Sequence, residues 1–137
     1  MKYMLDTNIC IYAVKKKFLS LQKNMTAHYS EGICISSIVK AEIEYGISKS
    51  AFPEKNRLAF ETFSKDFSVE NFDESAAGEY GKIRARLEKL GTPIGGNDLF
   101  IAAHCRALNH ILITHNLKEF ERVENLKLED WTIGAEE

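Results

Sequence analysis

The sequence has few of the residues and segments that mark special classes of protein. Its 137 residues include only two prolines and three cysteines. Cys10, Cys34 and Cys105 lie far apart in apolar stretches and form no C-x-x-C pair, so we interpret them as reduced core residues rather than as disulfides or metal ligands. No run approaches the ~20 consecutive apolar residues of a membrane-spanning helix, and residues 1–6 lack the apolar core of a secretion signal. These absences predict a cytoplasmic protein with no membrane segment.

Several catalytic signatures and a surplus of basic residues are also absent. Neither G-x-S-x-G, typical of serine hydrolases, nor G-x-x-x-x-G-K, typical of P-loop proteins, occurs. The 18 Lys and Arg residues against 20 Asp and Glu give a net charge of −2, which argues against a protein that coats nucleic acid electrostatically. No spacing typical of metal ligands relates the four histidines, which are His28, His104, His110 and His115.

The sequence does contain a regular alternation of short apolar runs and longer helical patterns. A chain that is 45% hydrophobic and 28% charged has the composition of a globular protein, and we expect one domain over residues 1–137. Strands are predicted at residues 3–5, 33–35, 67–72 and 111–114, with an edge strand at 126–128. Helices are predicted at 9–14, 18–28, 38–48, 51–67, from 73 or 75 to 90, and from 97 or 98 to 108. This alternation predicts an α/β/α sandwich around a short, mostly parallel sheet of four or five strands.

Acidic residues stand close to the carboxyl ends of these strands. Asp6 directly follows the first strand, Glu42 lies on the helix after the second, and Asp98 and Glu119 flank the fourth. Since parallel α/β sheets bind ligands at the carboxyl ends of their strands, we expect the four side chains to converge. Carboxylates that close repel one another unless a cation lies among them, and without His or Cys they favour Mg²⁺ or Mn²⁺. Such ions activate water and stabilise phosphoryl charge, so the pattern indicates phosphodiester hydrolysis.

Each acid also has a simpler interpretation when it is taken alone. Asp6 and Asp98 could be the N-caps of the helices that follow them, and Glu119 could be a solvated member of a charged stretch. Glu42 falls within the apolar arc of its predicted helix. A buried carboxylate needs a partner, which would be a metal ion or a buried Arg.

The order and spacing of several motifs resemble one family along nearly the whole chain. The motifs are Met4-Leu5-Asp6-Thr7-Asn8, Ile35-Ser36-Ser37 followed by Ala41-Glu42-Ile43-Glu44-Tyr45-Gly46, residues 91–98 with Ile101-Ala102-Ala103-His104, Thr114-His115-Asn116 with Glu119-Phe120, and Leu128-Glu129-Asp130-Trp131. In these motifs the chain is similar to the PIN-domain ribonucleases, specifically the VapC toxins of bacterial toxin–antitoxin pairs. The resemblance implies a Mg²⁺- or Mn²⁺-dependent endoribonuclease with this fold. The members most similar in these motifs cut initiator tRNA in its anticodon stem-loop.

The resemblance also implies roles for single residues. We expect Asp6, Asp98 and Glu119 to hold the metal ion, and Glu42 to orient or deprotonate the attacking water, so that all four are catalytic. Four further residues are expected to position the substrate, namely Asn8, Ser36, Thr114 and Asn116.

The implied partners are a small VapB antitoxin that blocks the site, operator DNA bound only through that antitoxin, and a second copy of the chain in a homodimer. Residues 18–29 and 51–67 are rich in Phe and Leu and are the predicted contact surfaces. With the four site acids set aside, 18 basic residues stand against 16 acids (20 minus 4), which predicts local rather than broad electrostatic binding of RNA. The predicted phosphate contacts are the three lysines 15–17, Arg84 and Arg86.

Two other classes of function stay open on the sequence alone. A receiver-like phospho-acceptor domain also uses a doubly wound sheet and Mg²⁺, and here Asp73 would be its acceptor and Lys118 its late lysine. It needs an acid pair after the first strand, where Asp6 stands alone. A PIN-like fold could also serve only to bind a partner.

Two departures from the family pattern, His115 in place of Asn and Gly96 in place of Pro, remove no carboxylate.

Overall fold

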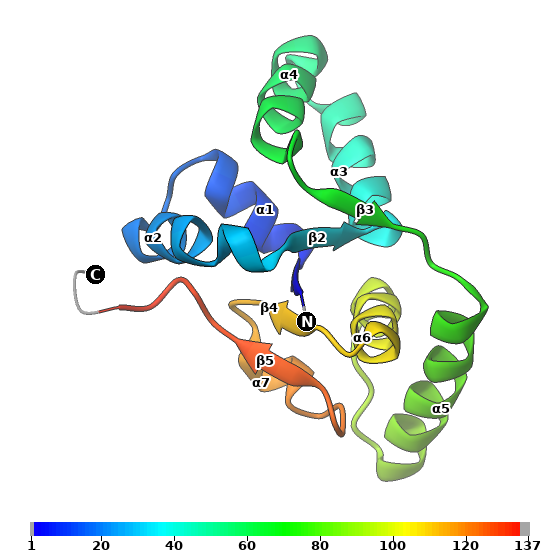
Figure 1. Ribbon diagram of the computed structural model, residues 1–137. Helices are drawn as coiled ribbons and strands as arrows, with labels where there is room; N and C mark the ends of the chain where they lie inside the picture. The colour runs from blue at the N-terminus through cyan, green and yellow to red at the C-terminus, as the bar shows by residue number, and fades with distance from the viewer. Residues whose placement is uncertain (1, 135–137) are drawn as a thin grey trace.

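The computed structural model describes residues 2–134, and Figure 1 shows its course. The strands are β1 (Tyr3–Leu5), β2 (Ile33–Ser36), β3 (Ser68–Glu70), β4 (Ile111–Ile113) and β5 (Lys127–Glu129). The helices are α1 (Thr7–Val14), α2 (Leu19–His28), α3 (Ser37–Lys49), α4 (Pro53–Ser64), α5 (Glu74–Leu90), α6 (Gly96–Leu108) and α7 (Leu117–Phe120). A 3₁₀ helix, η1 (Tyr29–Glu31), joins α2 to β2.

All five strands form one parallel sheet in the order β3-β2-β1-β4-β5. The central strand is β1, whose Met4 pairs with Cys34 of β2 on one side and Leu112 of β4 on the other. From β1 the chain moves outward to β2 and β3, and it then crosses back to β4 and β5. The winding direction therefore changes between β1 and β4. The crevice at such a switch point is the usual ligand site of an open parallel sheet.

The core lies around the three central strands. Every residue of β1 and β2 is buried, as are Leu112 and Ile113 of β4. Strands that are covered on both faces have continuous apolar sequences, which explains why these runs show no alternation. Helix α5 packs along α6, while α3 packs against α1 and α4, and Figure 1 shows these two groups of helices on opposite sides of the strands.

The structure confirms the α/β/α sandwich and the parallel sheet, and it corrects three details of the predicted elements. Helix α4 covers Pro53–Ser64 instead of 51–67, since a proline is well suited to the first helical position. Helix α6 begins one residue before Asn97, with Gly95 as its N-cap, so neither Asn97 nor Asp98 is the cap. The sequence did not indicate α7, because a single helical turn is too short to show a periodic pattern.

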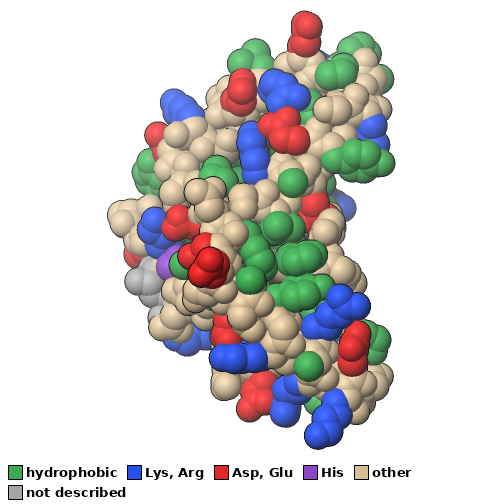
Figure 2. All heavy atoms as spheres, turned by 90° about the vertical axis from the view of Figure 1, so that its right-hand side faces the viewer, with side chains coloured by type: hydrophobic (Ala, Val, Ile, Leu, Met, Phe, Trp, Pro, Cys, Tyr) green, Lys and Arg blue, Asp and Glu red, His purple; other side chains and the backbone are tan. Residues whose placement is uncertain are grey.

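The face formed by α5 and α6 combines apolar and charged surface. Figure 2 views the molecule from this side, and hydrophobic side chains gather across its middle between charged upper and lower parts. The half-buried rings of Phe72 and Tyr80 both pack on Phe100, with centroids 5.4 Å and 4.4 Å away.

The cysteines and the helices agree with the absences noted in the sequence. All three cysteines are free and buried. Over the part of the chain that the structure describes, no helix has both the length and the apolar character to cross a membrane.

Candidate active site

Asp6 lies where β1 passes into α1, beside the switch point of the sheet. Its Oδ1 accepts a hydrogen bond of 2.9 Å from the backbone N–H of Ile9, so Asp6 is the N-cap of α1. The residue is only 6% exposed. Burial raises the pKa of Asp6 to about 6, although hydrogen bonds from Thr114 and Ile9 oppose the rise, and the charges of Glu42 and Asp130 add to it. Asp6 therefore both caps α1 and belongs to the acidic site.

Glu42 reaches the same edge of the sheet from α3, where two neutral donors hold its carboxylate. Thr7 Oγ1 donates to Oε1 over 2.5 Å, and Asn97 Nδ2 donates to Oε2 over 2.9 Å. Glu42 is half-buried and these partners are not arginine, so the alternative of a buried Arg is wrong. The donors fix the carboxylate without neutralising it, and each oxygen keeps a lone pair for water or a cation.

Asp98 and Glu119 form an interacting pair between the start of α6 and α7. The backbone N–H of Gly95 donates to Glu119 Oε1 over 3.1 Å, and Asn116 Nδ2 donates to Oε2 over 3.0 Å. A Cβ atom placed on Gly95 would lie 3.7 Å from Glu119 Oε1 and 3.8 Å from Asp98 Oδ2, so both carboxylates face this glycine. Glu119 is thus held in place by the fold instead of being freely solvated.

The electrostatics of this pair follow from burial and crowding. Burial is the largest cause that raises the pKa of Asp98, and with the hydrogen bond to Glu119 and the charges of Glu119, Asp6 and Glu42 it brings the value to about 7. Burial also acts to raise the pKa of Glu119, but hydrogen bonds, that with Asp98 foremost, outweigh it and the pKa is lowered. The pair therefore shares a proton near neutral pH, because four carboxylates at one edge cannot all ionise freely.

The raised pKa values predict how the stability of the metal-free protein depends on pH. In the unfolded chain Asp6 and Asp98 take the ordinary Asp value of 3.8, below their folded values of about 6 and about 7. Their contribution to stability is therefore complete below pH 4 and is lost as the pH rises through 6 and 7. We expect the contribution of these two acids to the free energy of unfolding in EDTA to fall by about 2 kcal/mol between pH 5 and pH 8, after allowance for partial exposure and coupling. Burial lowers the pKa values of His104 and His110, which acts in the opposite direction, so the wild type is compared with Asp98→Asn, which keeps both histidines. In urea unfolding at the two pH values, the stability of Asp98→Asn should fall by about 1 kcal/mol less than that of the wild type; an equal fall in both proteins would contradict the raised pKa of Asp98.

The donor set of the site suits a hard divalent cation. The set consists of four carboxylates from four separate segments, and it includes neither Cys nor His. Without a cation these groups repel one another, and after burial this repulsion also raises the pKa values of Asp6 and Asp98. As the side chains stand, no three His, Cys, Asp or Glu residues within 2–134 are grouped closely enough to hold a metal ion. A bound divalent ion would offset the negative charge of these carboxylates and relieve their repulsion.

The predicted substrate-positioning residues differ in how accessible they are. Asn8, in the first turn of α1, and Asn116 are exposed at this edge. Thr114 is fully buried at the end of β4, where its Oγ1 accepts from the Asn116 N–H over 3.0 Å. Ser36 is also 0% exposed; its Oγ caps α3 and lies 2.8 Å from Nδ1 of His104. Ser36 thus has no exposed atom for direct contact with a substrate, and it supports the start of the helix that carries Glu42.

Two of the residues predicted to contact phosphate already form ion pairs with acids. Arg84 Nε pairs with Glu88 over 3.2 Å, and Arg86 Nε pairs with Glu124 over 3.0 Å. Lys17 instead lies over aromatic rings, with Nζ 4.8 Å from the centroid of Tyr12. Lys17 is thus engaged with aromatic rings, whereas the two arginines are engaged with acids.

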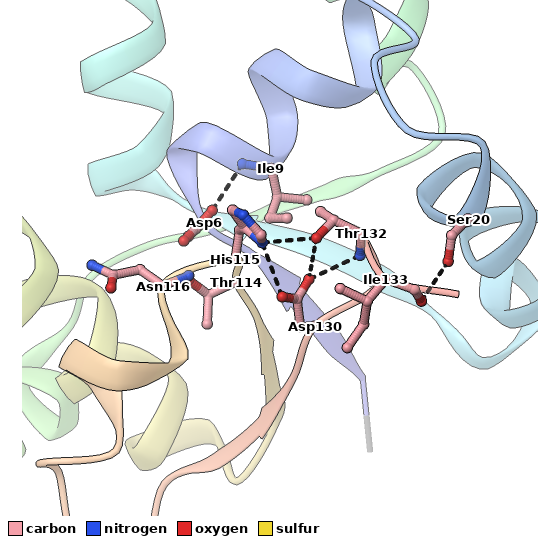
Figure 3. Close-up of polar contacts among 9 residues, drawn as sticks. All are labelled: Asp6, Ile9, Ser20, Thr114, His115, Asn116, Asp130, Thr132 and Ile133. Carbon is pink, nitrogen blue, oxygen red and sulfur yellow. Dashed lines mark hydrogen bonds and ion pairs between the residues drawn. The ribbon is translucent and has the colours of Figure 1, made fainter. Parts of the chain in front are cut away.

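The sequence did not identify some residues that build the site. Thr7 and Asn97 hold Glu42, and their only signal is that each directly adjoins a site acid. A second group joins His115 to Asp130 and Thr132, as Figure 3 shows. Its members come from the ends of β4 and β5, which pair in the sheet. No sequence spacing could have indicated this group, because the pairing of those strands is a tertiary feature.

This site, with carboxylates at the switch point of a short parallel sheet, is that of a PIN domain, and a family model described as "PIN domain" matches residues 3–126. A Rickettsia felis protein named "Ribonuclease VapC2" is 45% identical over 96% of this chain and 98% of its own. A Shigella flexneri protein named "tRNA(fMet)-specific endonuclease VapC" is 42% identical, with 96% and 99% covered. The chain belongs to the VapC ribonucleases of the PIN-domain family.

Solved structures agree with this assignment. The VapBC2 complex of Rickettsia felis, bound to a DNA fragment from its promoter, contains a chain that superposes with a TM-score of 0.91 at 44% identity, with 96% of this chain and 99% of that chain covered. DNA-bound VapBC from Salmonella typhimurium gives a TM-score of 0.90 at 40% identity, with 96% and 98% covered. The resemblance inferred from the sequence is thereby confirmed.

Proposed function

We propose that this protein is the toxin of a toxin–antitoxin pair and acts as an endoribonuclease that requires Mg²⁺ or Mn²⁺. The observation that carries the proposal is the convergence of Asp6, Glu42, Asp98 and Glu119 at the switch point of the sheet, in a chain that belongs to the VapC ribonucleases. Asp6, Asp98 and Glu119 would hold the ion. When bound, it supplies an activated water and stabilises charge on the phosphoryl oxygens.

The residues of this chain supply position and proton transfer. Glu42, fixed by Thr7 and Asn97, offers a free lone pair that orients a water and accepts its proton. Thr114 supports Asp6 and the backbone of Asn116, so it acts through those neighbours. The RNA strand crosses the carboxyl ends of β1 and β4, where Asn8 and Asn116 are exposed to meet it.

The substrate class is tRNA, and initiator tRNA cut in its anticodon stem-loop is the specific target proposed. The support is the name of the Shigella flexneri relative, "tRNA(fMet)-specific endonuclease VapC". The test is to incubate the purified protein and Mn²⁺ or Mg²⁺ with total bacterial RNA and to map the new ends. A cut in initiator tRNA with elongator tRNAs intact is expected. Cuts in another RNA would contradict the target, and no cut in any RNA would contradict the function.

The alternatives that the sequence left open lose their support. Asp73, the acceptor needed by a receiver-like domain, follows β3, an edge strand that β2 separates from β1 and Asp6. The similar proteins are named ribonucleases, which also disfavours a module that only binds a partner. Cleavage of RNA that depends on the four acids would exclude both alternatives.

The partner is a VapB-type antitoxin, since the similar solved structures are VapBC complexes. We place part of its contact in an apolar groove of about 270 Å³ between α1, α3 and α4. Ile11, Val14, Ile43 and Phe60 line the groove, and Glu42 lies at its border, so the groove continues into the acidic site. An antitoxin segment with apolar side chains in the groove and a basic side chain at the acids would block the site.

Filling the groove should weaken inhibition by the antitoxin. Gly46 in α3 lines the groove, and a Cβ atom there would meet no atom within 4 Å, so we expect the side chain of Gly46→Leu to occupy part of the groove. We expect the variant to need at least about tenfold more antitoxin for half-inhibition of RNA cleavage, the loss of one well-packed anchor. Gly78→Leu is the matched control, because Gly78 is also a helical glycine whose Cβ would meet nothing within 4 Å, but on α5. Equal inhibition of both variants would remove the antitoxin from the groove.

Further partners complete the proposal. Operator DNA is contacted only through the antitoxin, and the protein forms a homodimer in the cytoplasm. Among the predicted contact surfaces, Leu19 and Tyr29 are 53% and 50% exposed, while Phe52 and Leu58 are 68% and 65% exposed. Light scattering coupled to size exclusion, at two concentrations of the free protein, tests the dimer.

A further inference from the structure

His115 is an exposed residue at the edge of the acidic site, and both polar contacts and ring contacts hold its side chain. Its Nδ1 lies 2.9 Å from Asp130 Oδ2 and 2.8 Å from Thr132 Oγ1 (Figure 3). The Thr132 hydroxyl itself donates to Asp130 Oδ1 over 2.6 Å, so it cannot also donate to the ring, and Nδ1 is the donor toward Asp130 and Thr132. The side chain of Asp130 is 6% exposed, whereas that of His115 is 48% exposed. A buried carboxylate therefore anchors an imidazole that faces outward.

The ring of His115 is also fixed by packing. Its centroid lies 6.3 Å from that of Tyr12 and 5.8 Å from that of Phe18. The two ring neighbours and the contacts of Nδ1 leave the ring little freedom, so the ordering cost of a contact with a ligand is largely met in the free protein. His115 stands between Thr114 and Asn116, and the nearby charge of Asp130 is among the causes that raise the pKa of Asp6. The imidazole is thus a rigid part of the rim, on the same side of the sheet as Asp6 (Figure 3).

The second ring nitrogen of His115, Nε2, is left unpaired by the described part of the chain. With Nδ1 directed to Asp130, Nε2 has no hydrogen-bond partner among residues 2–134. In a neutral ring this nitrogen accepts a hydrogen bond, and in a protonated ring it donates one. A phosphate oxygen could meet only the second form, whereas a hydroxyl can donate or accept and so matches both. The group in RNA with that property is the ribose 2′-hydroxyl, which also distinguishes RNA from DNA.

We propose that His115 is a specificity-determining residue whose Nε2 binds the 2′-hydroxyl of a nucleotide next to the cleaved bond. Asp130 and Thr132 position the imidazole for this contact. The inference rests on the proposed ribonuclease function and adds the chemical group by which the site selects RNA.

The experiment pairs a change in the protein with a change in the substrate. Stem-loop RNAs of the initiator tRNA anticodon arm carry a single 2′-deoxy substitution at each position around the cut. For the wild type, one position should lower kcat/KM about tenfold, the equivalent of one hydrogen bond. His115→Phe, which keeps a flat ring against Tyr12 and Phe18, should lower kcat/KM to a similar extent on the all-ribose RNA and show no further loss at that position.

Several outcomes separate this inference from the proposed function. Failure of the wild type to cut the all-ribose stem-loop, intact tRNA or any other RNA would overturn both. Cleavage with the same 2′-deoxy penalties in wild type and His115→Phe would overturn the inference alone. His115→Ala provides a second variant if His115→Phe unfolds. His28→Ala is the matched control, because Nδ1 of His28 also contacts a carboxylate, Glu31, over 2.7 Å, and its ring stacks on Trp131; it should keep the wild-type penalties.

Discussion

Asp6→Asn is expected to lower the rate of RNA cleavage by at least about a thousandfold, because it removes a charge worth several kcal/mol in holding the metal ion and the reacting phosphate. The fold should survive the change. Asn caps helices as well as Asp does, so the hydrogen bond from the Ile9 N–H to the side chain is retained. Loss of a buried carboxylate with a raised pKa also relieves repulsion in the metal-free protein. Initial rates on tRNA, together with circular dichroism and thermal unfolding, measure both effects.

The matched control for this substitution is Asp73→Asn. Asp73 is likewise an aspartate N-cap, with its Oδ1 accepting from the Ala76 N–H over 3.0 Å at the start of α5. It should keep wild-type cleavage, since it is not one of the converging acids. If Asp6→Asn kept more than a tenth of the activity while folded, Asp6 would not be part of the catalytic site. If both variants lost activity together, the loss would reflect altered helices and not chemistry.

Removal of divalent cations by EDTA should reduce cleavage as strongly as Asp6→Asn does, and excess Mn²⁺ or Mg²⁺ should restore it. The reason for the loss is that the ion supplies the activated water and stabilises charge on the phosphoryl oxygens. In the free site, burial and mutual repulsion keep Asp98 protonated up to about pH 7. An ion must displace that proton, so we expect metal binding to release protons and to tighten as the pH rises from 6 to 8. Isothermal titration of metal into EDTA-treated protein, repeated in buffers of different ionisation enthalpy, counts the protons released.

Thermal unfolding gives an independent measure of the same ion. Because a ligand that binds only the folded state stabilises it, Mn²⁺ should raise the unfolding midpoint of the wild type at pH 8. Asp98→Asn should show a much smaller rise, since it removes both a ligand and part of the repulsion that the ion relieves. Full cleavage in EDTA, or an equal rise in the midpoint of both proteins, would refute a metal held by these acids.

The acidic site shows how far local sequence features can be interpreted. Asp6 and Asp98 stand next to predicted strand or helix boundaries, so their general place followed from the strand–helix alternation. The exact role of Asp98 did not follow, because Gly95 caps α6 and moves the acid into the first turn. Taken alone, Glu119 in its charged stretch gives no sign of a role in the site. Only α7 and the hydrogen bond from the Gly95 N–H place it beside Asp98.

The contacts that hold Glu42 mark the point where sequence reasoning ends. Its position on the apolar arc of a helix correctly indicated that it needs a partner. The partners, Thr7 and Asn97, lie 35 and 55 positions away along the chain. Both are small neutral residues in ordinary helix starts, so their own sequence surroundings carry no sign of the contact.

By itself, the sequence determined the order of the strands and of helices α1 to α6, the buried character of β1 and β2, and the presence of four acids near strand ends. These features depend on periodicity, capping and composition, which act over a few residues. The tertiary structure alone decided that β4 pairs with β1, which places the switch point beside Asp6. It also decided that β5 pairs with β4, which brings Asp130 to His115. Strand order is set by the packing of the whole chain, so no local pattern could reveal these pairings.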